Sequence, residues 1–212
     1  MSEPSDRRSR KRLATRQEIS NAATRLFWER GFDQVTVDEI AAAADVGRMT
    51  VFNHFRRKED MFFDRDDEGR DFLRDALRQR DPGVAPIEVL RLLAHRLVAQ
   101  QSPYVNFSPE SQSFMATIAG SETLKARARA IRDELAQVVT VALAECAGRE
   151  PTDSAAHLAA NLLLATWTVA FIQAHRTFQQ RRDAKEAKAT FLAFVDKGTL
   201  GAKAALAGTP YA

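Results

Sequence analysis

The spacing of apolar residues is helical along almost the whole chain. No stretch alternates apolar and polar residues between turn-forming dipeptides, as a half-buried strand would. Proline and glycine interrupt the pattern at residues 81–83, 102–103 and 148–151. The sequence therefore predicts an all-α fold. From about residue 58 onward we expect these longer helices: roughly 58–80, 86–101, 108–119, 121–147, 154–181 and 184–206.

The first clear amphipathic helix ends at a glycine. Its apolar stripe, with the spacing i, i+3, i+4, i+7 and i+8, consists of Ile19, Ala22, Ala23, Leu26 and Phe27. Gly31 can adopt the left-handed conformation that ends a helix. We therefore expect a helix from about Arg16 to Arg30, preceded by a flexible basic arm over residues 1–14.

Two shorter helices are expected next. Thr36 and Glu39 form a capping box, in which the hydroxyl accepts a bond from a free backbone N–H group and the carboxylate reaches back. This pair starts the second helix. Gly47 is an acceptable N-cap for a third helix over about 48–55.

The third helix has an apolar side and a polar side. Val51 and Phe55, four residues apart, would pack on Ile40 and Ala44 of the second helix. The exposed side then carries Met49, Thr50 and Asn53, flanked by Phe52 and His54, with Arg48 in the first turn. Arginine can pair with guanine, asparagine with adenine, and a threonine methyl with a thymine methyl. The layout favours a DNA-binding helix-turn-helix, with a merely structural bundle as the alternative.

Charge is distributed unevenly over this region. The net charge of the chain is only +3, but no acid occurs between Val46 and Lys58. Residues 1–16 have a balance of +4, residues 17–47 of −4 and residues 48–58 of +4. Two basic segments around an acidic one are expected where selected edges of a small domain approach phosphates. A solvated charge run is the alternative for either segment.

Residues 15–62, "TRQEISNAATRLFWERGFDQVTVDEIAAAADVGRMTVFNHFRRKEDMF", resemble the N-terminal domain of tetracycline-repressor (TetR) family transcription regulators. The resemblance implies a homodimer whose third helices read two halves of a palindromic operator in double-stranded DNA. It also implies a variable helical C-terminal domain that binds an inducer and forms the dimer interface. We accordingly expect a DNA-binding domain over 15–60 and a ligand-binding and dimerisation domain over 61–212.

The resemblance assigns DNA contacts residue by residue. The matching positions are Thr36, Arg48, Thr50, Phe52, His54 and Lys58, to which the exposed Asn53 is added by spacing. Phe52 stands where the family usually has tyrosine, so a phenol–phosphate bond is absent. Gly47 and Met49 replace the frequent serine and glycine, so no base preference can be transferred. The arm before residue 15 could lie in a minor groove or along phosphates.

The C-terminal helices are less specific. Two apolar stripes are expected to form a four-helix dimer interface with their symmetry mates, although packing within one chain is the alternative. The first consists of Leu158, Leu162, Ala165, Val169 and Ile172, and the second of Phe191, Phe194, Val195, Gly198 and Ala202. Candidates to line a pocket for a small apolar or aromatic inducer are Phe72, Phe114, Trp167 and Phe171, although aromatic residues at helical spacing can equally be plain core.

Other sites are not expected. His157 and His175 are 18 residues apart on one predicted helix, or about 27 Å, too far to share a metal ion. The single cysteine, Cys146, excludes an internal disulfide and fits a reducing cytoplasm. The most apolar stretch, 158–172, is shorter than the roughly 20 residues that span a bilayer. No cofactor and no membrane partner are expected.

The leading hypothesis is a DNA-binding repressor released by an inducer. A constitutive DNA-binding protein without a ligand is the second hypothesis. The third hypothesis is a helical enzyme. It is disfavoured because the sequence contains no glycine-rich phosphate loop, no H-E-x-x-H and no G-x-S-x-G motif. We therefore expect no catalytic residues.

Overall fold

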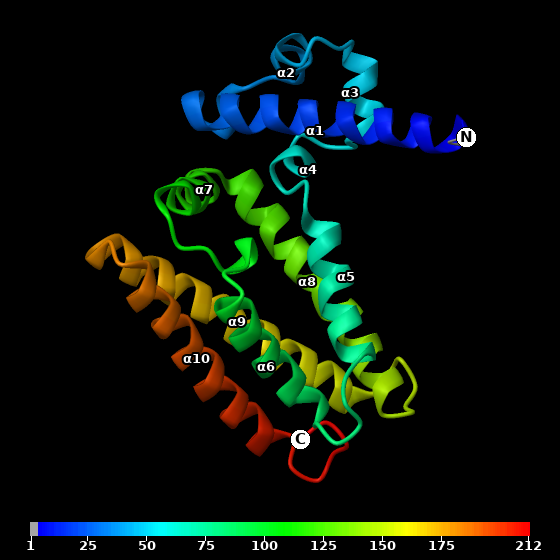
Figure 1. The fold of residues 1–212 in the computed structure, drawn as a ribbon, viewed down its shortest axis with the longest axis vertical. Helices are drawn as coiled ribbons and strands as arrows, with labels where there is room; N and C mark the ends of the chain where they lie inside the picture. The colour runs from blue at the N-terminus through cyan, green and yellow to red at the C-terminus, as the bar shows by residue number, and fades with distance from the viewer. Residues whose placement is uncertain (1–3) are drawn as a thin grey trace. The chain divides into compact units, whose positions relative to one another are not determined.

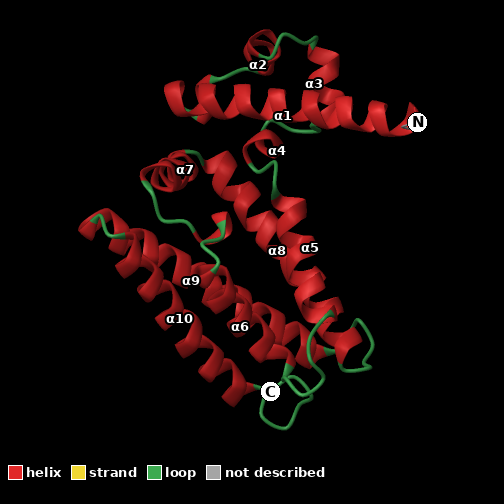
Figure 2. Cartoon of the chain, in the orientation of Figure 1, coloured by secondary structure: helices red, strands yellow, loops and turns green. Residues whose placement is uncertain are grey.

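The computed structural model describes residues 4–212, and in that part of the chain it contains helices and loops but no strand (Figures 1 and 2). The predicted all-α fold is confirmed. The elements are α1 (Pro4–Arg30), η1 (Phe32–Gln34), α2 (Val37–Ala43), α3 (Arg48–His54), α4 (Glu59–Phe62), α5 (Asp66–Arg78), α6 (Pro86–Ala99), η2 (Pro103–Val105), α7 (Pro109–Gly120), α8 (Glu122–Cys146), α9 (Ser154–Arg181) and α10 (Ala184–Ala205).

Two of the expected helices differ from the structure. The first was predicted to start near Arg16, yet α1 runs from Pro4. Arginine, lysine, alanine and leucine all have high helix propensity, so this segment is helical without an apolar stripe. The segment 58–80 was expected to be one helix, but it is divided into α4 and α5. The break follows Phe63, whose φ of −103° and ψ of 41° are not helical. The remaining predicted ends lie within two residues of the observed ones.

The chain divides into two compact units. The first comprises Met1–Asp66 and Ser113–Ala128, and the second comprises Asp67–Gln112 and Arg129–Ala212. Helices α7 and α8 thus each contribute residues to both units. The expected functional domains, 15–60 and 61–212, stay a prediction. No pattern in the sequence predicted that residues 113–128 group with the N-terminal helices.

The core of the first unit joins α1 to the short helices. Ile19, Ile40 and Val51 are each 0% exposed and belong to one apolar cluster that also includes Phe55. Val51 and Phe55 therefore face inward, as their four-residue spacing predicted, and Ala44 packs against the same cluster. This packing fixes which side of α3 remains outside.

The second unit is built around a long antiparallel pair, α9 and α10, which lie side by side in Figure 1. Asp153 caps α9 by accepting bonds from the backbone N–H groups of Ala155 and Ala156, and Asp183 caps α10 in the same way. Helix α6 packs on α10, and Phe191 lies in the common core. The cluster contains aromatic and aliphatic side chains from α5, α6, α8, α9 and α10 and from η2.

Candidate nucleic-acid interface

The turn between α2 and α3 has the conformation that its residues favour. Asp45 has a φ of 51°, a left-handed conformation that aspartate tolerates better than most residues. Gly47 then caps α3 with φ −74° and ψ 150°, and its carbonyl accepts a 2.8 Å bond from the Thr50 N–H. The predicted N-cap is confirmed. The short loop between the helices holds α3 against α2. The first helical turn of α3 remains accessible to solvent.

Helix α2 begins at the predicted capping box. The Thr36 N–H and hydroxyl both donate to Glu39 Oε2 at 2.8 Å, and Thr36 Oγ1 accepts a 3.3 Å bond from the Glu39 N–H. Bonds from the Thr36 backbone and hydroxyl, together with Arg30, lower the pKa of Glu39 to about 2. The carboxylate is therefore charged at neutral pH, and Thr36 is exposed at the start of the helix.

The outward side of α3 carries the residues expected to read DNA. Met49 is 70% exposed and Phe52 is 39% exposed, while Asn53 is exposed and Thr50 is half-buried. No acid lies on this helix. These residue types can contact base edges and methyl groups without repelling phosphates. The structure thus brings the predicted α3 residues together on one face, although contact with DNA stays a prediction.

Arg48 is held in place by neighbours on two sides. Its Nη1 donates to Asp38 Oδ2 of α2 at 2.7 Å, and its guanidinium carbon lies 5.5 Å from the centre of the Phe52 ring. Both partners of the ion pair are about 60% exposed, at 59% and 62%. The pair is therefore weak enough to be exchanged for a phosphate or a base.

His54 lies where α3 meets α1. The Arg16 guanidinium donates to the His54 carbonyl at 2.6 Å and lies 4.1 Å from the centre of the Phe55 ring. Partial burial and the charges of Arg12 and Arg16 lower the pKa of His54. These effects favour the neutral form of the imidazole. Sequence reasoning did not assign this role to Arg16, because the contact joins residues 38 positions apart.

Lys58 makes contacts that the sequence did not indicate. Its ammonium donates to the Phe32 and Val35 carbonyls at 2.8 and 2.9 Å and lies 4.1 Å from the centre of the Phe32 ring. Burial lowers its pKa, and Asp33 and Glu59 partly offset this effect. In this structure Lys58 fixes η1 against the end of the α3–α4 connection. A phosphate contact by Lys58 stays a prediction.

Residues 19–64 match the profile of a family described as bacterial regulatory proteins, tetR family. The N-terminal domain of this chain belongs to the tetR family. The matched segment contains α2, the turn, α3 and α4 together with most of the apolar part of α1.

Relatives of this tetR-family domain carry names of DNA-binding regulators. The HTH-type transcriptional repressor Rv1474c of Mycobacterium tuberculosis is 40% identical over 50 residues, which are 24% of this chain and 27% of that protein. The HTH-type transcriptional regulator TcmR of Streptomyces glaucescens is 39% identical over 54 residues, or 26% of this chain and 24% of that protein. The similarity thus spans about a quarter of the length of these relatives.

Solved structures share the fold over most of the chain. A structure assigned to a TetR-family transcriptional regulator of Mesorhizobium loti has a TM-score of 0.54 and 20% identity, and the match covers 90% of this chain and 97% of that one. Salmonella enterica GusR has a TM-score of 0.53 and 20% identity, with coverage of 97% and 98%. The helices that follow the tetR-family domain therefore have the fold found in these proteins.

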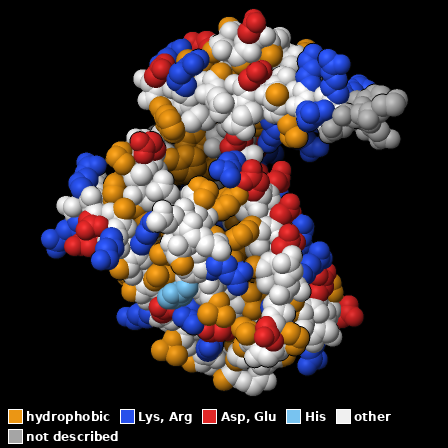
Figure 3. Space-filling view, viewed as in Figure 1, with side chains coloured by type: hydrophobic (Ala, Val, Ile, Leu, Met, Phe, Trp, Pro, Cys, Tyr) orange, Lys and Arg blue, Asp and Glu red, His pale blue; other side chains and the backbone are white. Residues whose placement is uncertain are grey.

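Basic side chains gather around the N-terminal part of α1 in the space-filling view (Figure 3). The arginines and lysine at positions 7, 8, 10, 11 and 12 are all exposed on this helix. The first three residues of the expected arm lie outside the described residues. From Pro4 onward the segment expected to be a flexible arm is part of helix α1.

The ring contacts of the four candidate pocket residues fall into three groups. Phe114 stacks on Phe62 at 4.5 Å in the core of the first unit, and Phe72 pairs with Tyr104 at 5.9 Å in the second. Trp167 and Phe171 are 6.2 Å apart and both contact Phe191. Trp167, Phe171 and Phe191 thus form an aromatic cluster. Phe107 contacts this cluster and also the His175 ring. Whether any of them contacts a ligand stays a prediction.

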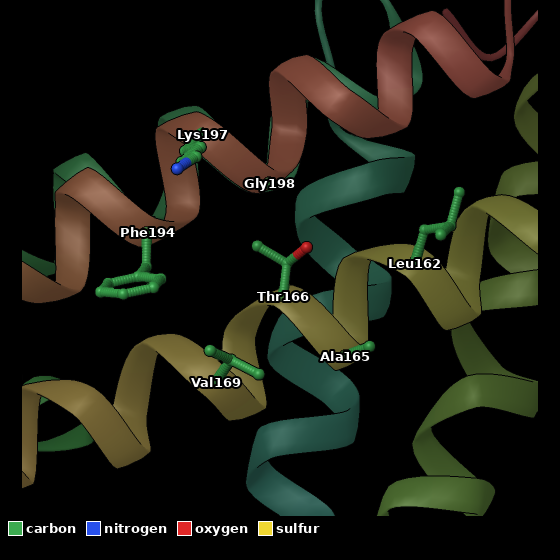
Figure 4. A pocket seen from close by; sticks show the side chains of 7 residues that line it. All are labelled: Leu162, Ala165, Thr166, Val169, Phe194, Lys197 and Gly198. Carbon is green, nitrogen blue, oxygen red and sulfur yellow. The ribbon is translucent and has the colours of Figure 1, made fainter.

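A groove of about 400 Å³ lies on the outer side of α9 and α10 (Figure 4). It is lined by Leu162, Ala165, Thr166, Val169, Phe194, Lys197 and Gly198. The second predicted stripe is therefore divided. Phe194 and Gly198 face this groove, whereas Phe191, Val195 and Ala202 are buried in the chain's own core. Because successive residues are rotated by about 100° around the helix axis, the groove-facing pair and the buried three lie on adjoining sides of α10.

Helix α9 is long and apolar enough to cross a membrane by length and composition, although only 28% of its most apolar window is buried. The inward side of α9 packs on α10 and on the core of the second unit. Such a helix is also expected where an apolar face of a folded protein is covered by another subunit. The sequence expectation that the most apolar stretch is too short to span a bilayer rested on residues 158–172 alone. The whole helix, whose bounds 154–181 were predicted correctly, passes the test by length and composition.

Proposed function

We propose that this protein is a sequence-specific DNA-binding transcription regulator that acts as a dimeric repressor in the cytoplasm. The observation that carries the proposal is the outward face of α3, which is accessible, free of acids and held by a tetR-family helix-turn-helix. A helix presented in this way fits the major groove of DNA. Thr50 and Asn53 are assigned to base contacts, and Arg48, Thr36, Phe52 and His54 to bases or the backbone.

The outer face of α9 and α10 supports a homodimer. Leu158, Val169, Ile172 and Phe194 are between 38% and 45% exposed, although they are apolar. A second copy would cover these side chains by a two-fold arrangement of the four helices. Two copies of α3 would then read the two halves of a palindromic operator. The interface consists of α9 with the groove-lining side of α10.

The aromatic cluster of the second unit supports a small-molecule inducer. The indole N–H of Trp167 is buried and has no acceptor among the described residues. An apolar or aromatic ligand with an oxygen atom near Trp167 would satisfy this donor. The inducer would favour a state of the dimer in which the spacing of the two α3 helices no longer fits successive major-groove faces. The free energy of operator binding would then weaken by as much as the inducer prefers this state over the DNA-binding state.

A constitutive DNA-binding protein is the second candidate function. It is favoured by Phe114, which stacks on Phe62 and packs against the apolar core of the first unit, as a plain core residue does. Neither candidate function requires catalysis, and we propose that the protein is not an enzyme.

The proposed function is tested by selecting binding sites from a pool of random duplexes with the purified full chain. The expected result is enrichment of an inverted repeat whose half-sites lie one or two helical turns apart. Enrichment of no sequence, with equal weak retention of all duplexes, would overturn the proposal. A screen for small molecules that raise the melting temperature and release the selected duplex then separates the inducible regulator from the constitutive protein.

A further inference from the structure

The first half of α1 is a helix with many positive charges. After Asp6 no acid occurs before Glu18. Arg8 and Arg12 are exposed, and among the side chains that the structure describes no acid pairs with either of them. Two exposed arginines of this kind are expected to meet negative charge.

The arginines follow the side of α1 that packs on the domain. Arg8, Arg12 and Arg16 recur every four residues and fall in the same sector, about 100° wide, as Ile19, Ala23 and Phe27. The last three side chains are buried in the core of the first unit. One face of α1 therefore changes from apolar to cationic as the helix extends toward its N-terminus.

This cationic face begins at the end of α3. Arg16 donates to the His54 carbonyl at 2.6 Å, and the charge of Arg12 acts on the His54 imidazole. Figure 1 shows α1 continuing past α3 toward the N-terminus. Arg8 lies one turn beyond Arg12, about 6 Å farther along the axis. The face is thus a continuation of the proposed DNA-binding surface.

The helical conformation limits which part of DNA this segment can touch. The minor groove of B-DNA is about 6 Å wide, whereas a helix with its side chains is about 10–12 Å across. An extended arm could enter the minor groove, but this helix cannot without deforming it. The sugar-phosphate backbone beside the groove remains accessible to long arginine side chains.

We propose that Arg8 and Arg12 form a rigid cationic extension of the DNA-binding surface that holds backbone phosphates flanking the half-site read by α3. This inference rests on the proposed function, since it requires that α3 binds duplex DNA. The extension contributes affinity that depends steeply on salt and does not discriminate between base sequences. Its rigidity comes from the continuous helix that joins it to the core.

The test measures fluorescence-anisotropy titrations of the full chain with its selected duplex and with an unrelated duplex over a series of KCl concentrations. The variants are Arg8→Gln with Arg12→Gln, and Arg25→Gln as a control that removes one positive charge from another side of α1. Arg25 is exposed on α1 and points about 140° away from Arg12. We expect the double variant to reduce the slope of log K against log salt by about 2, on both duplexes alike, whereas the control changes it little.

A third variant, Ala14→Pro, separates a rigid extension from a flexible arm. Proline is tolerated in the first turn of a helix but removes the bond from residue 14 to Arg10, so the core part of α1 persists while the basic segment is uncoupled. All charges remain. We expect Ala14→Pro to lower affinity and salt slope as the double variant does, with an unchanged melting temperature.

Two results would overturn the extension while the regulator stands. One is a double variant whose slope equals that of Arg25→Gln, and the other is an Ala14→Pro variant that binds like the wild type. A wild-type protein without selective binding to any duplex would instead overturn the proposed function, and with it the basis of this inference.

Discussion

Gly198 of α10 lies directly against Thr166 of α9. A Cβ atom added at Gly198 would be 2.9 Å from the Thr166 Cβ and closer still to the two terminal atoms of that side chain. Contacts this short do not occur between real side chains, so the two helices approach closely only because residue 198 is glycine.

Gly198→Ala is expected to destabilise the protein by about 1–3 kcal/mol, because the added methyl group overpacks the crossing of α9 and α10. The matched control is Gly69→Ala on α5, where an added Cβ meets nothing within 4 Å. This control should stabilise the chain by about 0.5–1 kcal/mol through helix propensity. Urea unfolding at one fixed protein concentration measures both. Equal effects of the two substitutions would contradict the close approach.

Thr36→Ala should lower the free energy of unfolding by about 1 kcal/mol, since α2 loses the side-chain oxygen that accepts a bond from the Glu39 N–H. Thr36→Ser keeps that oxygen and is expected to lie within a few tenths of a kcal/mol of the wild type. The measurement is again urea unfolding. An alanine variant as stable as the serine variant would show that the capping box does not stabilise α2.

Stability is expected to fall in mild acid because of His175. Burial lowers its pKa, and its Nδ1 lies 3.4 Å from the Gln112 side-chain nitrogen, a pairing that suits a neutral imidazole. The unfolded chain, with a histidine pKa of about 6.5, therefore binds more protons than the folded chain in mild acid. The free energy of unfolding should decrease as the pH falls from about 7.5 to 5.5.

His175→Gln should flatten this pH dependence, while His54, whose pKa is also lowered, accounts for part of what remains. The matched control is His157→Gln, because His157 is an exposed histidine of the same helix. Thermal unfolding at several pH values checks the prediction. A His175→Gln profile as steep as that of the control would rule out the half-buried His175 imidazole as a source of the pH dependence.

Val169→Glu should convert the proposed dimer to a monomer, because it puts a charge into the apolar face formed by α9 and α10. Val169 is 44% exposed, and Leu92 on α6, with 39% exposed, provides the control Leu92→Glu. Light scattering after gel filtration should give twice the 23.6 kDa chain mass for the wild type and control, and the single mass for Val169→Glu. If Val169→Glu still has the mass of a dimer, the interface does not include this part of α9.

Local signals in the sequence predicted much of the first unit. The capping box of Thr36 and Glu39 fixed the start of α2, and the spacing of Val51 and Phe55 fixed the inward side of α3, because both features depend on residues only three or four apart. These predictions are confirmed. The exposed face of α3 follows from them directly.

Contacts between distant residues could not be predicted in the same way. Lys58 bonds to the Phe32 and Val35 carbonyls, 26 and 23 residues away, and no spacing rule indicates such partners. Phe114 has the same helical spacing as any core residue, so its stacking on Phe62 was indistinguishable from a place in a ligand pocket. Residues 4–15 were not predicted to be helical, because this segment has no apolar stripe and only its helix propensity indicates a helix.

The most direct test of the account is the sequence selectivity of Asn53→Ala. Asn21→Ala is its control, since Asn21 is an exposed asparagine on α1 that bonds to Gln17. The quantity measured is the ratio of affinities for the selected duplex and for the same duplex changed at one base pair of each half-site. If Asn53 reads an adenine from the exposed face of α3, its loss should remove about 1–3 kcal/mol of discrimination at one position, with the control unchanged. Equal selectivity of both variants at every position would contradict the assignment of α3 as the helix that reads DNA through this residue.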